Sequence, residues 1–195
     1  MAGRRAGDGI LSLVRDLEPK PEEYARVTDP GRYAVLHEAA DLLLDELTER
    51  YTVERREIKG PLRAVRLIPH MPAAAPLAVT FTDFPGIKLR FGRWYEESLP
   101  NCGCDACDEH PAELVADLRT HVSALVEGGL WERVQRRVTG SWSETRLIGP
   151  DFSTGRSVPL DPRDARAARR EGSAAAVQWA PWPRRSAPET VGGHR

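Results

Sequence analysis

Residues 77–91, with the sequence LAVTFTDFPGIKLRF, decide the fold class of this chain. Bulky apolar residues alternate with small, polar or cationic ones on both sides of a turn; they are Leu77, Val79, Phe81, Ile87, Leu89 and Phe91. The stretch between them, DFPG, is typical of a tight turn. Because successive side chains of a strand point to opposite faces, the pattern predicts a β-hairpin with one buried face and one cationic, solvated face.

Four further stretches are predicted to extend this hairpin into a sheet. Residues 51–58 and 64–68 precede it, and the first of these carries so many charges that it is expected either at a sheet edge or with one face solvated. Residues 131–138 and 142–148 follow it, on either side of the turn Thr139-Gly140. The sequence therefore predicts an antiparallel sheet of four to six strands.

Two longer stretches have the period of an amphipathic helix. The first begins at Asp29-Pro30, because Asp29 can cap a first turn and Pro30 suits the first helical position. Its apolar stripe consists of Tyr33, Leu36, Ala40, Leu43, Leu44, Leu47 and Tyr51. The second begins near residues 108–111 and ends at the glycine pair 128–129. We therefore expect an α+β fold, with two amphipathic helices packed on one face of the sheet.

Composition divides the chain of 195 residues into three parts. Residues 1–21 form an N-terminal segment, whose apolar residues from Ile10 to Leu17 fit either a short helix or a frayed terminus. Residues 22–149 are predicted to be the α+β domain. Residues 150–195 form a Pro/Arg/Ala-rich tail that is expected to be largely disordered, apart from a short helix over residues 161–170. Within it, the segment Trp179–Arg185 fits either a protein-contact site or an arm folded back on the domain.

Residues 102–110, with the sequence CGCDACDEH, hold all three cysteines of the chain. An odd number of cysteines within one loop argues against a secreted disulfide framework. Three thiols and one imidazole can ligate zinc in a tetrahedral site, which predicts zinc as a cofactor and the ligands Cys102, Cys104, Cys107 and His110. His70 or His121 could supply the fourth ligand instead, because the chain has no second cysteine pair.

Two other interpretations of the cysteine loop stay open. Cys104 and Cys107 precede a predicted helix, whose N-terminus would favour a reactive thiolate, although Asp105 and Asp108 oppose this effect. The three cysteines could also be small residues that only shape a loop. The same loop therefore fits a structural zinc site, a thiol-redox site or no chemistry at all.

Several of these stretches together resemble an uncharacterised actinobacterial family known only as a domain of unknown function. They are PGRY at 30–33 with the following helix, the hairpin from Phe81 to Phe91, GRW at 92–94 and, above all, CGCDACDE at 102–109. The resemblance covers about residues 22–150 and excludes the tail. It implies no established activity, so no catalytic residue is assigned from it.

Charge and motifs argue against several classes of function. The formal net charge of −1 gives no global field that would recruit nucleic acid, and no apolar run approaches the roughly 20 residues of a membrane span. A cytoplasmic location without a membrane partner is therefore expected. The sequence contains no phosphate-binding glycine loop, no nucleophile elbow and no HExxH motif.

The function expected from these observations is that of a small, non-catalytic, cytoplasmic binding or accessory domain, in which the cysteine loop is a structural zinc site. A thiol-redox or metal-dependent enzyme that uses the same loop is the alternative. A nucleic-acid-binding protein that uses the arginine-rich strands and tail is the third class, which the near-neutral net charge disfavours.

Overall fold

The computed structural model describes residues 21–170 and 176–186, which form an α+β fold with two antiparallel sheets. The first sheet contains, in spatial order, β1 (Val53–Ile58), β2 (Ala64–Pro69), β3 (Leu77–Phe81), β4 (Ile87–Phe91) and β5 (Tyr95–Leu99). The second contains, again in spatial order, β8 (Ser153–Pro159), β7 (Gly140–Ile148), β6 (Leu130–Arg137) and β9 (Val177–Gln178). The fold class predicted from the sequence is confirmed, but the division of the strands into two sheets was not predicted.

The predicted hairpin is strands β3 and β4, which pair with Val79 opposite Leu89. Their inward residues are buried, whereas Lys88 and Arg90 are exposed on the other face. This alternation follows directly from the pleat of a strand.

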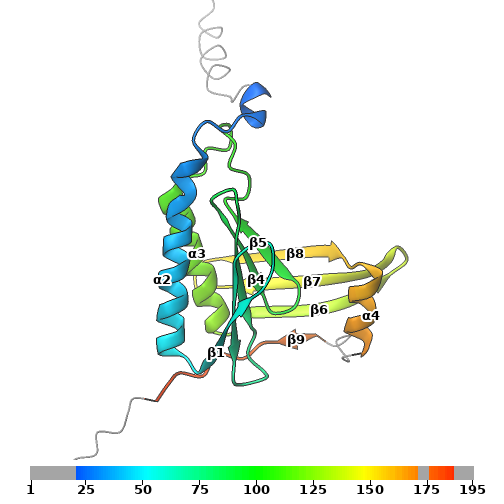
Figure 1. The fold of residues 1–195 in the computed structure, drawn as a ribbon. Helices are drawn as coiled ribbons and strands as arrows, with labels where there is room; N and C mark the ends of the chain where they lie inside the picture. Colours follow the sequence, from blue (N-terminus) through cyan, green and yellow to red (C-terminus); the bar gives the residue numbers. More distant parts are fainter. Residues whose placement is uncertain (1–20, 171–175, 187–195) are drawn as a thin grey trace, which may run out of the picture.

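Helices α2 (Val35–Arg50) and α3 (Pro111–Val126) lie side by side on one face of the first sheet (Figure 1). Short 3₁₀ turns, η1 (Pro21–Ala25) and η2 (Pro30–Ala34), precede α2. Fully buried residues from both helices and the sheet form one core, which includes Leu36, Leu44, Leu118, Leu125, Leu67, Leu89 and Phe91. The two predicted amphipathic helices are therefore confirmed, together with their packing on one face.

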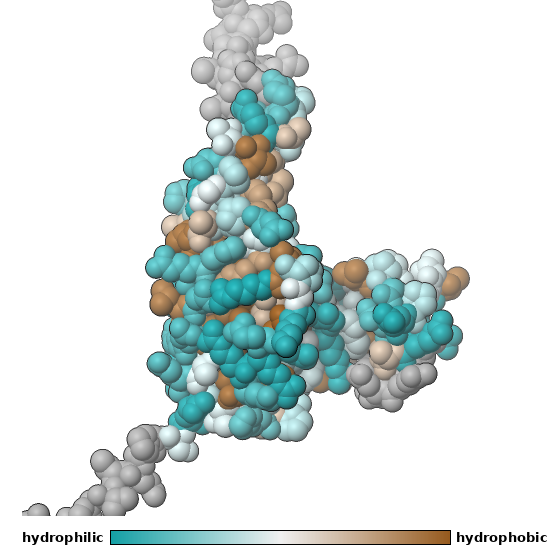
Figure 2. Space-filling view, viewed as in Figure 1, coloured by the Kyte–Doolittle hydropathy of each residue, from teal (hydrophilic) through white to brown (hydrophobic). Residues whose placement is uncertain are grey.

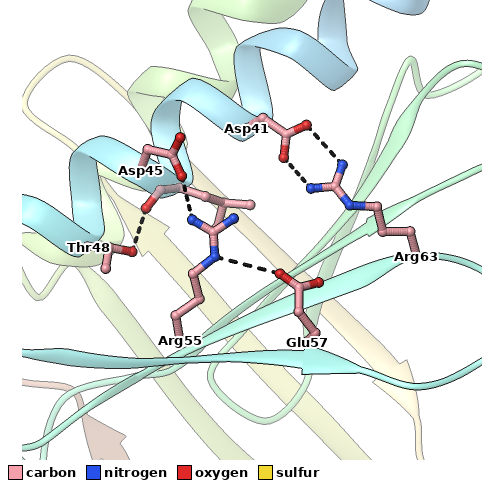
Figure 3. Close-up of polar contacts among 7 residues, drawn as sticks. Asp41, Asp45, Thr48, Arg55, Glu57 and Arg63 are labelled. Atoms are coloured by element: carbon pink, nitrogen blue, oxygen red, sulfur yellow. Dashed lines mark hydrogen bonds and ion pairs between the residues drawn. The ribbon is translucent and has the colours of Figure 1, made fainter.

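Charged contacts join the solvated side of α2 to the first sheet (Figure 3). Arg63, just before β2, makes two hydrogen bonds of 2.9 and 2.5 Å to the carboxylate of Asp41. This guanidinium holds the pKa of Asp41 below its usual range. Arg55 on β1 makes a similar contact of 2.5 Å to Asp45. These pairs orient α2 over the edge strand rather than adding much stability, because they are largely exposed.

Strand β5 was not predicted, because a charged residue occupies its inward face. Tyr95 and Leu99 are buried, but the inward residue between them is Glu97. Its carboxylate lies 2.7 Å from Nδ1 of His121 on α3 and 3.8 Å from the guanidinium of Arg156. The carboxylate of Glu97 thus occupies the inward position at which an apolar residue would have indicated a strand.

Parts of residues 150–195, which were expected to be a largely disordered tail after a domain that ends at residue 149, have regular structure. Residues 153–159 form β8, which pairs with β7 along its whole length. The short helix expected over 161–170 is α4 (Pro162–Arg170), capped by Asp161, which accepts hydrogen bonds from the backbone N–H groups of Arg163 and Asp164. The expectations for residues 1–20 lie outside the described residues.

The C-terminal arm, residues 177–186, folds back on the domain. Trp179 is 7% exposed and Trp182 is 3% exposed, so the tryptophans are not displayed for a partner. The interpretation of Trp179–Arg185 as a folded-back arm is therefore confirmed, and its interpretation as a displayed contact segment is wrong for both tryptophans. Within residues 21–170 and 176–186, no helix is long and apolar enough to cross a membrane.

Candidate metal centre

The cysteine loop runs from the end of β5 to the start of α3 and folds back tightly on itself. Gly103 has a φ of +76°, and a Cβ at this position would lie 2.7 Å from the ring of Phe84. Any larger residue would be both strained and in collision with that ring. Glycine between the first two cysteines is therefore required by the fold of the loop.

The loop brings the three cysteine sulfurs together. The sulfur atoms of Cys102, Cys104 and Cys107 all lie within 4.8 Å of one another, and the Cys102 and Cys104 sulfurs are 3.2 Å apart. Cys104 is buried, whereas Cys102 and Cys107 are exposed. The predicted convergence of the three thiols is thus observed.

Glu109 holds the first half of the loop from within. Its carboxylate accepts hydrogen bonds from the backbone N–H groups of Asn101, Cys102 and Gly103, at 3.1, 2.9 and 3.2 Å. A carboxylate that accepts hydrogen bonds from three consecutive N–H groups fixes the backbone of residues 101–103. This backbone positions Cys102 and leads directly to Cys104, so the loop is ordered without a bound ligand.

Asp105 fastens the loop to the segment before α2. Its carboxylate accepts hydrogen bonds from the backbone N–H of Thr28 (2.8 Å), the Thr28 hydroxyl (2.5 Å) and Nε of Arg26 (2.7 Å). These donors lower the pKa of Asp105 to about 2, with the Thr28 hydroxyl as the largest cause. A second ion pair joins the two segments, with Nη1 of Arg32 2.8 Å from Oδ1 of Asp108. The cysteine loop and residues 23–32 therefore form one unit.

The pKa values of Cys104 and Cys107 shift in opposite directions. The pKa of Cys104 is lowered, first because the Cys102 thiol donates a hydrogen bond to its sulfur and then because the backbone N–H of Cys107 does so. The pKa of Cys107 is raised to about 12, mainly by its hydrogen bonds with Cys104 and Cys102. Cys104 therefore becomes a thiolate, the form that binds metal, more readily than Cys107.

His110 is not part of the sulfur group. It is exposed and occupies the N-cap position of α3, three residues after Cys107. His121 contacts Glu97 instead, and His70 is exposed beyond β2. The structure therefore joins three of the four predicted ligands.

Sequence reasoning missed the parts played by Glu109 and Asp105. Asp105 was expected only to oppose a thiolate, whereas its carboxylate faces Thr28 and Arg26. No pattern in the sequence indicates a contact between residues 28 and 105. Glu109, seven residues after Cys102, could have been considered, because a carboxylate close in sequence can accept bonds from loop amides.

A family model matches residues 12–186 of this chain. The chain belongs to the family of unknown function DUF6226. The DUF6226 match continues past residue 150 to the end of the C-terminal arm, which agrees with the pairing of β8 with β7 and with the burial of both tryptophans. No curated protein and no solved structure matches the chain.

The sulfur group of this DUF6226 member fits one zinc ion in its donor chemistry. Zinc in structural sites prefers thiolates at about 2.3 Å in a tetrahedron, which places the sulfurs roughly 3.8 Å apart. The sulfurs of Cys102 and Cys104 are 3.2 Å apart, and no two of the three sulfurs are more than 4.8 Å apart, so the observed separations are close to this value. Three sulfurs leave one position of the tetrahedron to another ligand.

Proposed function

We propose that this chain is a non-catalytic binding or accessory domain in which Cys102, Cys104 and Cys107 hold one structural zinc ion. The ion cross-links the three cysteines and so stabilises the cysteine loop. The loop in turn holds residues 23–32 against the domain. The single observation that carries the proposal is the convergence of three sulfurs in a loop that Glu109 and Asp105 already fix.

We assign the fourth ligand position to His110. Its ring makes no hydrogen bond within the described part of the chain, and it is exposed. Its place three residues after Cys107 keeps it within the same short loop. Three thiolates and one histidine are a common ligand set for structural zinc.

Metal analysis of the protein, purified without a histidine tag, tests the proposal. We expect about one zinc per chain, and a chelator should lower the midpoint of thermal unfolding, because metal-binding energy stabilises only the folded state. Cys104→Ser should remove both the zinc and the effect of the chelator. His110→Ala should retain zinc at lower affinity.

Asn101→Ala is the matched control, because Asn101 is exposed in the same loop and contributes only its backbone N–H to Glu109. This variant should bind zinc like the wild type. Wild-type protein without zinc, or Cys104→Ser protein with as much zinc as the wild type, would overturn the proposal.

A thiol-redox site is the second candidate, favoured by the 3.2 Å between the Cys102 and Cys104 sulfurs. Its reaction would be oxidation of these two thiols by glutathione disulfide, which yields one protein disulfide and two glutathione thiols. Alkylation and mass spectrometry after incubation in glutathione buffers of defined ratio would detect it. A disulfide that forms in a buffer of mainly reduced glutathione would favour the thiol-redox function over the structural zinc site.

A further inference from the structure

A cleft of about 510 Å³ opens on the face of the first sheet that α2 and α3 leave uncovered. Helix α4 lies on this side of the sheet (Figure 1), in a lobe that projects from the main body (Figure 2). The cleft is bounded by the outer residues of β2 and β4, by the turn after β4, by α4 and by Trp179 of the C-terminal arm. Its volume is in the range of sites for small molecules.

Two arginines stand at matched positions on one wall of the cleft. Arg66 on β2 and Arg90 on β4 both pair with Ala78 of the strand between them. Neighbouring strands are about 4.8 Å apart, so the two Cα atoms are separated by roughly 10 Å across a residue with almost no side chain. Two long guanidinium side chains at this separation can close on one anionic group.

Only one of these arginines is held in place by the protein. Nε and Nη2 of Arg90 donate to the backbone carbonyl of Arg93 at 3.0 and 2.5 Å. The Arg66 side chain has no hydrogen bond or ion pair within residues 21–170 and 176–186. A fixed guanidinium beside an uncommitted one is suited to a ligand with a bidentate anionic group.

The charges around the cleft favour an anion. Among the described residues that line it are three guanidinium groups, those of Arg66, Arg90 and Arg93, and one carboxylate, that of Asp164. Glu96 lies 3.7 Å from Arg90 at an exposed position, where the attraction is weak. Glu132 lies behind the cleft wall, with its oxygens turned to the amides of residues 93 and 94 and to the Trp179 indole.

The remaining walls are flat and apolar. The Arg93 guanidinium carbon lies 5.7 Å from the ring centroid of Trp94 and 5.5 Å from that of Trp179, so the arginine bridges the two indoles. Ile58 on β1, whose side chain is exposed, also lines the cleft. The indole of Trp94, which is partly buried and lines the cleft, provides a flat apolar surface for a planar ring.

We propose that this cleft binds a small molecule in which a phosphate or carboxylate group is attached to a planar ring. The anionic group lies between Arg66 and Arg90, and the ring lies against the indole of Trp94. The cleft shares no residue with the cysteine loop, so this inference is independent of the zinc site.

The five tryptophans of the chain allow a direct test, because each gives one indole N–H signal in a two-dimensional NMR spectrum. The probes are phenyl phosphate, benzoate, the neutral analogue benzamide and inorganic phosphate. We expect phenyl phosphate, benzoate or both to shift the signals of Trp94 and Trp179 saturably. Binding of phenyl phosphate alone assigns phosphate esters, and binding of benzoate alone assigns carboxylates. Benzamide and inorganic phosphate should bind at least about tenfold more weakly, because each lacks one of the two recognised groups.

Arg66→Gln should lower the affinity about tenfold or more without altering the rest of the spectrum, since Arg66 is exposed. Arg56→Gln is the matched control, because Arg56 pairs with Arg66 on the neighbouring strand but does not line the cleft. The inference is wrong if neither anion moves Trp94 and Trp179, if benzamide binds equally well, or if Arg66→Gln binds like the wild type. Shifts confined to Trp131 and Trp142 would overturn it too, by placing the anion on the second sheet.

Discussion

Glu132 on β6 is a fully buried carboxylate that joins the two sheets. It accepts hydrogen bonds from the backbone N–H of Arg93 (3.2 Å), the backbone N–H of Trp94 (2.9 Å) and the indole N–H of Trp179 (2.8 Å). Gly92, with a φ of +59°, permits this approach, because a Cβ there would lie 2.6 Å from the carboxylate. Burial nevertheless outweighs these donors and raises the pKa of Glu132.

The raised pKa of Glu132 makes a testable contribution to stability. The folded state binds this proton more tightly than the unfolded state, so the wild type should lose stability as the pH rises from about 4, the unfolded pKa, through the folded value. Glu132→Gln does not titrate and should lack this loss. The difference in free energy of unfolding between Glu132→Gln and the wild type should therefore move in favour of the variant as the pH rises, as measured by urea denaturation.

Glu144→Gln on the neighbouring strand β7 should show the opposite slope. Arg133 lowers the pKa of Glu144, so its contribution is present above the unfolded pKa and is lost as the pH falls through the folded value. Substitution of either glutamate also changes hydrogen bonds by an amount that does not depend on pH, so only the slopes are diagnostic. Equal slopes for the two variants would contradict the opposite environments of Glu132 and Glu144.

At the scale of single residues, the sequence predicted that the three thiols converge, but not the contacts that hold their loop in place. Three cysteines in six residues necessarily lie near one another, so their convergence follows from spacing alone. The contacts of Asp105 with Thr28 and of Glu132 with Trp179 span 77 and 47 residues. Such contacts depend on the complete fold, and a single sequence contains no local signal for them.

At the scale of elements, β3 and β4 provide the sharpest comparison. Leu89 is 1% exposed, and Leu89→Ala should destabilise the protein by about 2–5 kcal/mol, because it leaves a cavity in the core. Lys88→Ala, one residue earlier on the solvated face, should change stability by no more than about 0.5 kcal/mol. Urea denaturation of both variants measures the difference. Similar losses at the two positions would show that the strand is out of the register described here.

Elements with a clear apolar period were predicted, whereas strands β5 and β8, which lack one, were missed. Strands β3 and β4 bury every second residue, and the two long helices bury continuous stripes. Strand β8, with the sequence STGRSVP, is exposed at almost every position and is held by backbone pairing with β7. Pairing of this kind leaves no apolar pattern to detect.

At the scale of the whole molecule, the C-terminal arm connects parts that are distant in sequence. Gln178 pairs with Trp131 of the second sheet, whereas the indole N–H of Trp182 donates to the carbonyl of Ala75, just before β3, at 2.8 Å. Further along, the backbone N–H of Arg185 donates to the carbonyl of Arg50 at the end of α2. One segment thus contacts both sheets and a helix (Figure 1).

The arm also shows why composition alone did not indicate the structure of residues 177–186. Prolines at 181 and 183 and scattered arginines are typical of disordered segments. Two tryptophans placed three residues apart reverse this expectation, because each buries a large apolar area and also finds an acceptor for its indole N–H. The stability of such a segment depends on a few anchors rather than on its average composition.

Trypsin digestion tests whether Trp182 anchors the C-terminal arm to the domain. The backbone of residues 183–185 is hydrogen-bonded to residues 50–52, so the bonds after Arg184 and Arg185 should be cut only when the arm opens. Trp182→Ala removes the side chain that packs edge-on against Tyr51, with ring centroids 5.6 Å apart, and should speed cleavage after Arg184 and Arg185 by about tenfold or more. Trp142→Ala is the control, because Trp142 lies only partly buried on the second sheet and should leave cleavage there unchanged. Mass spectrometry of timed digests identifies the sites, and cleavage after Arg184 that is equally fast in wild type and Trp182→Ala would show that Trp182 does not anchor the arm.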